Sequence, residues 1–228
     1  MRLNRAGVLF GVAYLLIGLA WVAVTSPAPP LLLAGWFLLV ALIGCFIPGI
    51  ANQVSLARAH LAAPAIVYAL QPSHFGQLAV VLAVAGLTDL VDGTIARRFD
   101  RASTLGGGLD PVVDGILLGA VAIGLAWAAT LPPWLAVVIV LRYLLPAVAG
   151  LVLISTHRRP ELRHTVSGQM STALIIILVG GICLFGFLKQ DAGNVVVGAE
   201  IVIPIATVAT FVHLGWVARR PVAAPGPG

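Results

Sequence analysis

Five of the chain's eight acidic residues fall between Asp89 and Asp114, inside an otherwise strongly apolar sequence. The stretch reads Asp89-x2-Asp92-Gly93-x2-Ala96-Arg97-x8-Gly106-x3-Asp110-x3-Asp114. A carboxylate in or beside a lipid bilayer costs roughly 3 kcal/mol or more, so a cluster of four marks a functional site. Carboxylate oxygens favour Mg²⁺ or Mn²⁺ over zinc, which makes a hard divalent cation the expected partner.

The spacing of these acids is helical. Asp89 and Asp92 are separated by three positions and Asp110 and Asp114 by four, so each pair shares one helix face. The segment between the two pairs is long enough to fold two helices antiparallel. We therefore expect all four carboxylates to converge at the membrane interface. The alternative is a buried salt-bridge network that the cluster would form with Arg97 and Arg98.

The composition is that of a polytopic membrane protein. The 228 residues are 60% hydrophobic and 9% charged, with a mean hydropathy of +1.07. Soluble domains carry about a quarter charged residues. The net charge of +5 does not indicate nucleic-acid binding, because the basic residues form no long run or stripe. The two cysteines lie in apolar runs and are expected to be buried thiols.

Pro and Gly divide the chain into apolar segments long enough to span a bilayer. Eight spanning helices are predicted, over 7–25, 31–49, 54–71, 77–97, 108–130, 134–155, 168–188 and 195–217. Nearly all arginines then fall on one side, so the positive-inside rule makes both termini and the acidic cluster cytoplasmic. The expected location is a bacterial plasma membrane. The fold class is an all-α membrane helix bundle.

The acidic stretch resembles the signature of the CDP-alcohol phosphotransferases, D-x2-D-G-x2-A-R-x8-G-x3-D-x3-D, at all eight specified positions. The resemblance covers roughly residues 50 to 218 and implies that family's six-helix core. It divides the chain into two additional transmembrane helices (1–50), the core (51–218) and a disordered tail (219–228). The sequence assigns no function to the two additional helices.

The resemblance also implies roles for individual residues. Asp89, Asp92, Asp110 and Asp114 would hold two divalent ions, and Asp114 would be the general base. Cytidine nucleotide binding would involve Gly93, Ala96, Arg97, Ser103 and Gly106, together with Asn52 and Ser55 from the segment NQVSLAR that ends in Arg58. The implied reaction moves a phosphatidyl group from CDP-diacylglycerol to an alcohol and releases CMP.

The alcohol acceptor stays open. Leu109-Asp110-Pro111 resembles the phosphatidylglycerophosphate synthases, but their Gly-Lys-x-Lys-Thr pattern appears here as Gly168-Gln169-Met170-Ser171-Thr172, without the lysines. Glycerol 3-phosphate, a neutral polyol and a lipid all remain candidates. Arg142, Arg158 and Arg163 are the candidate acceptor-binding residues.

Two other classes of function compete with transfer. Acids inside a helix bundle also form ion pathways, so a divalent-cation transporter is the first alternative. A pathway would place polar residues through the bilayer, whereas every clustered acid here maps to one end. The second alternative is a non-catalytic membrane partner protein. Gly115-x3-Gly119 indicates either close helix packing or the seam of a homodimer.

Overall fold

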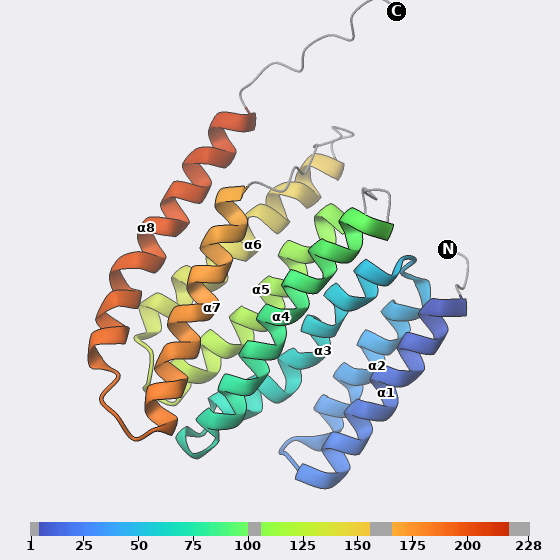
Figure 1. The fold of residues 1–228 in the computed structure, drawn as a ribbon, viewed down its shortest axis with the longest axis horizontal. Coiled ribbons are helices and arrows are strands. Elements are labelled where there is room, and N and C mark those ends of the chain that lie inside the picture. The colour runs from blue at the N-terminus through green and yellow to red at the C-terminus, as the bar shows by residue number, and fades with distance from the viewer. Residues whose placement is uncertain (1–4, 100–105, 156–165, 219–228) are drawn as a thin grey trace, which may run out of the picture.

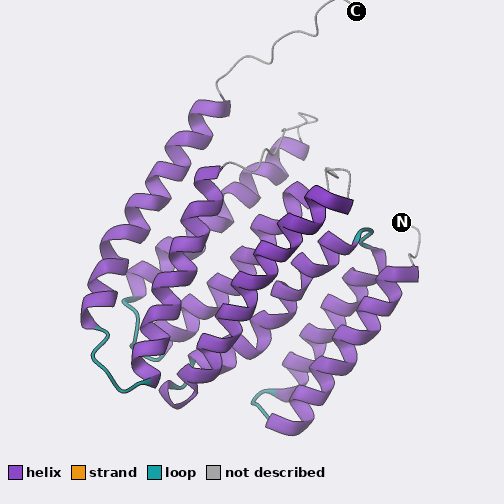
Figure 2. Cartoon of the chain, viewed as in Figure 1, coloured by secondary structure: helices purple, strands orange, loops and turns teal. Residues whose placement is uncertain are grey.

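The protein is an all-helical bundle. The structure, a computed structural model, describes residues 5–99, 106–155 and 166–218; for 90–99, 106–108, 150–155, 166–167 and 216–218 it describes the backbone alone. No strand occurs in the described part of the chain (Figure 2). Its elements are α1 (Arg5–Thr25), α2 (Pro30–Phe46), α3 (Ile50–Ala69), the short 3₁₀ helix η1 (Pro72–His74), α4 (Phe75–Phe99), α5 (Gly106–Trp127), α6 (Pro133–Ser155), α7 (Val166–Phe187) and α8 (Gly193–Ala218).

Each predicted segment corresponds to one helix, with ends that differ by up to four residues. The largest difference is in α3, which begins at Ile50 instead of residue 54. Gly49 explains the early start, because its φ of 92° lets the chain reverse within the dipeptide Pro48-Gly49. The next helix can therefore begin at once. As a result Asn52 lies in the first turn of α3 and Arg58 lies inside it.

The helices run alongside one another, and α3 is central to their packing (Figure 1). It packs against α4 and α5, while α6 packs on α5 and α7 on α4. The last helix, α8, packs on α7 and α6. The end of α4 and the start of α5 lie at the same end of the bundle as the start of α1 (Figure 1). We call this end the acidic end, because α4 and α5 carry the aspartates.

The exterior of the bundle is apolar. On α8, Val197, Ile201, Ile205, Val208 and Val212 are each more than half exposed, at a spacing of three to four residues. Such a stripe is unfavourable in water and suits contact with lipid chains. By length and composition, four described segments are able to span a membrane, and two shorter apolar helices accompany them. The protein is an integral membrane protein.

Two predicted spans, α3 and α4, are neither among those four segments nor among the two shorter apolar helices. The reason for α3 is its content of polar residues, including Asn52, Gln53, Arg58 and His60, all of which are buried against neighbouring helices. A helix that faces protein on most sides does not need to be apolar all round. Both helices nevertheless run parallel to the spanning ones (Figure 1).

The first two helices pair with each other and pack on α3. Polar side chains fix this α1–α2 hairpin to the α3 backbone: the Tyr14 hydroxyl donates to the Gln53 carbonyl, and Trp36 Nε1 donates to the Ala59 carbonyl at 2.9 Å. In return, Gln53 Nε2 donates to the carbonyls of Gly44 and Ile47 at the end of α2, both at 2.8 Å. Both helices of the hairpin, α1 and α2, are therefore hydrogen-bonded to α3.

Close packing of α5 against α6 depends on a glycine. A Cβ on Gly115 would lie 2.6 Å from Cβ of Tyr143, too close for any real contact, and one on Gly119 would contact Val140 at 3.8 Å. The glycine pair therefore serves helix packing within the chain, which was one of its two expected roles.

Candidate active site

A buried arginine organises the acidic cluster. Arg58, on the inner face of α3, is 0% exposed. Its Nη1 donates to Oδ1 of Asp89 at 2.5 Å and to Oδ1 of Asp114 at 2.6 Å, and its Nη2 donates to Oδ1 of Asp110 at 3.1 Å. One guanidinium thus joins α3 to α4 and α5. An ion of this kind is kept inside a bundle only with hydrogen-bonded partners of opposite charge, and the aspartates supply them.

The three described carboxylates differ in their access to solvent. The side chain of Asp114 is 12% exposed, that of Asp110 is 26% and that of Asp89 is 42%. Asp110 and Asp114 come from successive turns of α5, and Asp89 faces them from α4. Asp114, which the family resemblance implies to be the general base, is therefore the most enclosed of the three.

The chemistry of this donor set fits a hard divalent cation. Every acidic ligand is a carboxylate oxygen, and the three carboxylates carry two more negative charges than the one guanidinium balances. In the described arrangement, however, no group of three or more His, Cys, Asp or Glu residues is poised around a common ion position. The space between the carboxylates holds the Arg58 guanidinium instead.

Asn52 and Ser55 lie on α3, about two turns and one turn before Arg58 respectively, and both are buried. The Asn52 amide donates to the Pro48 carbonyl at 2.7 Å, and the Ser55 hydroxyl donates to the Ala51 carbonyl at 3.2 Å. The structure therefore brings these two predicted nucleotide-binding residues to the helix that carries the cluster's arginine.

The remaining motif positions are only partly described. Asp92, Gly93, Ala96 and Arg97 lie in the last turns of α4, and Gly106 is the first residue of α5. Their side chains are not among those described. Ser103, Arg158 and Arg163 lie outside the described residues altogether.

A second buried arginine joins α6, α7 and α8. Arg142, 5% exposed, donates from Nη1 to the hydroxyls of Ser171 (2.5 Å) and Thr210 (3.3 Å) and from Nη2 to the Gly168 carbonyl (3.2 Å). All three partners are neutral, and no described carboxylate forms an ion pair with Arg142. Its Nε is buried with no hydrogen-bond partner among the described atoms.

Tyr143 lies between the two arginine clusters. Its ring centroid is 5.3 Å from the Arg142 guanidinium, its hydroxyl is 3.1 Å from Oγ1 of Thr172, and its Cβ packs on Gly115, the neighbour of Asp114. Tyr143 therefore places a neutral hydroxyl next to the Arg142 cluster.

Sequence reasoning missed the partner of the aspartates. It expected Arg97 and Arg98 to be the neighbouring cations and gave Arg58 no part in the cluster. A usable signal was present: Arg58 is an isolated arginine in an apolar segment, and such a residue requires carboxylates from another helix. The contacts of Arg142 with Ser171 and Thr210 were not expected either.

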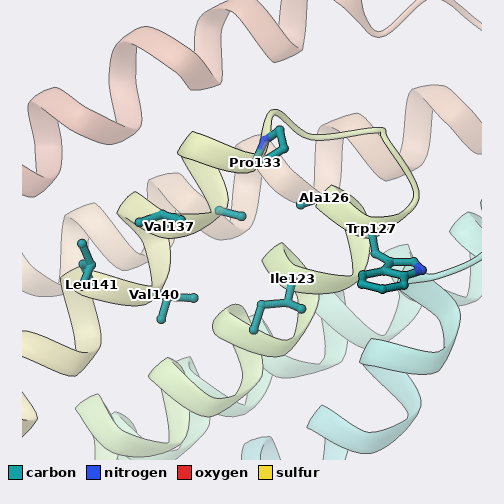
Figure 3. Close-up of a pocket in the computed structure, with 8 residues that line it drawn as sticks. Ile123, Ala126, Trp127, Pro133, Val137, Val140 and Leu141 are labelled. Atoms are coloured by element: carbon teal, nitrogen blue, oxygen red, sulfur yellow. The ribbon is translucent and has the colours of Figure 1, made fainter.

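A hollow between α5 and α6 contains none of the candidate residues (Figure 3). It lies at the end of α5 and the start of α6, away from the acidic end. Its lining is apolar throughout: Ile123, Ala126, Trp127, Pro133, Ala136, Val137, Val140 and Leu141. This surface offers no group for chemistry and suits contact with lipid.

Comparison with known proteins gives a consistent set of relatives. A sequence model of the CDP-alcohol phosphatidyltransferase family matches residues 49–213, which excludes α1 and α2. The probable cardiolipin synthase (CMP-forming) of Drosophila melanogaster is 33% identical over 162 residues, 63% of this chain and 50% of that protein. The probable phosphatidylglycerophosphate synthase of Mycobacterium tuberculosis is 31% identical over 140 residues, 61% of this chain and 63% of that protein.

A third relative is the CDP-diacylglycerol–glycerol-3-phosphate 3-phosphatidyltransferase of Bacillus subtilis. It is 29% identical over 147 residues, 58% of this chain and 75% of that protein. The chain thus spans only half the length of the fly relative and less than two thirds of the mycobacterial one.

Proposed function

Because the chain belongs to the CDP-alcohol phosphatidyltransferase family, we propose that it transfers a phosphatidyl group from CDP-diacylglycerol to an alcohol and releases CMP. The observation that carries the proposal is the convergence of Asp89, Asp110 and Asp114 from two helices onto one buried position beside α3. Carboxylates gathered in this way at a membrane interface suit an anionic, metal-dependent phosphoryl substrate.

In the proposed reaction, Asp114 accepts the proton of the acceptor hydroxyl. The acceptor oxygen forms a bond to the phosphorus that carries diacylglycerol, and the bond from that phosphorus to the bridging oxygen breaks, so that CMP leaves with the electron pair. The enclosure of Asp114 suits a general base, because bulk water has little access to compete for its proton.

Asp89, Asp92, Asp110 and Asp114 would hold two Mg²⁺ or Mn²⁺ ions. When bound, these ions would neutralise charge on the pyrophosphate oxygens. For the nucleotide we propose Asn52 and Ser55 from α3 and the motif residues Gly93, Ala96, Arg97, Ser103 and Gly106. The Asn52 amide bonds to the Pro48 carbonyl just before α3, and the Ser55 hydroxyl bonds to the Ala51 carbonyl within α3, so both would exchange those bonds for the ligand.

For the acceptor we propose the side of the site near Arg142, with Arg158 and Arg163 from the following segment. A buried guanidinium with neutral partners suits an anionic group such as a phosphate. Both glycerol 3-phosphate and the phosphodiester of an anionic lipid fit that chemistry, and a neutral polyol does not use it. The names of the relatives include cardiolipin and phosphatidylglycerophosphate synthases, so both anionic acceptors are candidates.

The proposal includes the division of the chain and its orientation in the membrane. Residues 51–218 form the catalytic core, and 1–50 form an added hairpin that precedes it. The acidic end and both termini face the cytoplasm of a bacterium, because the arginines gather on that side of the membrane. A homodimer would use a surface other than Gly115 and Gly119, since α6 covers both glycines.

The test is metal-dependent CMP release by the purified full chain with CDP-diacylglycerol. Glycerol 3-phosphate, phosphatidylglycerol, inositol phosphate and serine should be offered in parallel. Asp114→Asn keeps the shape of the side chain but cannot act as a base, so kcat should fall by about 10³ with the productive acceptor. Divalent-cation flux into proteoliposomes with no CMP release from any acceptor would favour the transporter.

A further inference from the structure

The position of Arg58 conflicts with that of the ions that the aspartates are proposed to hold. Its Nη1 lies 2.5 Å from Asp89 and 2.6 Å from Asp114, so the two Oδ1 atoms from α4 and α5 converge on a single nitrogen. Nη2 contacts Asp110 at 3.1 Å, which brings the third carboxylate to the same guanidinium. The space between the three carboxylates is therefore held by a permanent positive charge of the chain itself.

A divalent ion cannot share that space. Mg²⁺ requires ligand oxygens at about 2.0–2.1 Å in near-octahedral geometry. An ion bound by the same Oδ1 atoms would lie against the guanidinium, where two positive charges repel at short range in a medium that screens them poorly. In agreement with this conflict, no group of three or more His, Cys, Asp or Glu residues surrounds a common ion position among the described side chains.

We propose that Arg58 is the internal counter-ion of the aspartate cluster and that its guanidinium must leave Asp89 and Asp114 before a divalent metal binds there. The guanidinium and the metal are thus alternative occupants of one position. In the absence of metal Arg58 holds α3, α4 and α5 together, and loading exchanges that link for coordination by the carboxylates. This inference rests on the metal site of the proposed function.

Removal of the buried Arg58 charge should have opposite effects on stability and on metal affinity. Breaking a buried ion pair normally destabilises a protein, because a charge is left without its partner. In Arg58→Gln the metal-free protein should therefore unfold at a lower temperature than the wild type. Its affinity for metal should rise, by about tenfold or more, because no competing cation remains. Saturating metal should recover most of the lost stability.

Mn²⁺ binding to the full chain in detergent or nanodiscs is the decisive measurement, by electron paramagnetic resonance of free Mn²⁺ or by calorimetry without substrate. Thermal unfolding with EDTA or with excess Mn²⁺ accompanies it. Arg142→Gln is the matched control, since it removes the other buried arginine, which contacts no described carboxylate. The control should bind Mn²⁺ with wild-type affinity.

Arg58→Lys is the second variant if Arg58→Gln does not fold. A lysine keeps the charge but loses the fork that reaches three carboxylates, so Mn²⁺ affinity should still rise, by a smaller factor. Unchanged or weaker Mn²⁺ affinity in a folded Arg58 variant would overturn the role of Arg58 as a competitor of the metal. CMP release by the wild type would still support the proposed function. If the wild type binds no Mn²⁺ and releases no CMP, both fail together.

Discussion

At the scale of the residue, the two buried arginines sit in opposite electrostatic settings. Arg58 is surrounded by carboxylates, whereas Arg142 is surrounded by hydroxyls and a carbonyl. The carboxylates around Arg58 suit a cation, and the Arg142 guanidinium, whose described partners are all neutral, suits an anion. The proposed reaction would require one site for a metal and one for an anionic acceptor, and the two arginine clusters would provide them on different helices, with Tyr143 next to Arg142.

Position 171 contributes to this separation. In the related phosphatidylglycerophosphate synthase pattern a lysine is expected there, whereas Ser171 here accepts a 2.5 Å hydrogen bond from Arg142. A lysine would place a second cation beside a buried guanidinium, an arrangement that is tolerable only when an anion lies between them. The serine instead gives Arg142 a neutral hydrogen-bond partner.

The glycine beside the proposed base gives a prediction at this scale. Gly115→Ala should lower the free energy of unfolding by about 1–3 kcal/mol, because the new methyl group would lie 2.6 Å from Cβ of Tyr143 and force α5 and α6 apart. Thermal unfolding in detergent measures the loss. Gly198→Ala on α8 is the control, since a Cβ there meets nothing within 4 Å. Equal stability of the two variants would contradict the close packing.

At the scale of the element, α3 is the helix on which the site depends. It carries Asn52, Ser55 and Arg58 and contacts both aspartate-bearing helices. The α1–α2 hairpin lies outside the residues matched by the family model, yet it donates hydrogen bonds to two α3 carbonyls. The hairpin therefore contacts the helix that carries Arg58, although it lies outside the family match.

The hairpin contacts give a second prediction. Tyr14→Phe and Trp36→Phe should each lower the free energy of unfolding, and the loss of one buried hydrogen bond corresponds to about 1 kcal/mol. Trp36→Phe also removes part of a packed ring, so its effect should be the larger. Thr25→Val is the control, because its hydroxyl bonds only to the Trp21 carbonyl of its own helix. An equal loss in the control would show that the bonds to α3 have no special weight.

The elements were predictable from the sequence to a greater degree than the site. Helix positions follow from local signals such as Pro48-Gly49 and Pro132-Pro133, which act within a few residues. The contact of Arg58 with Asp89 and Asp114 joins residues 31 and 56 positions apart. The isolated arginine indicates that carboxylate partners exist, but only the packing of α3 between α4 and α5 decides which carboxylates they are. The predicted start of α3, residue 54, was four residues too late, because the positive φ of Gly49 cannot be read from a hydropathy plot.

At the scale of the whole molecule, the bundle has two distinct ends. Arg5 lies near the acidic end, whereas Lys189, in the turn between α7 and α8, lies at the other (Figure 1). On the proposed orientation the first end is cytoplasmic. In a background with Cys45 and Cys183 replaced, a cysteine at Gln190 should react with an impermeant maleimide on intact cells, and a cysteine at Arg5 only after lysis. The reverse labelling would invert the topology.

The anchoring of α3 limits how the site can move. Tyr14 bonds to the Gln53 carbonyl, which precedes Arg58 in α3, and Trp36 bonds to the carbonyl of Ala59, which directly follows it. A helix bonded at both of these points resists sliding along its axis and turning about it. If Arg58 leaves the carboxylates as proposed, its side chain would therefore change position while the α3 backbone stays in place against α4 and α5.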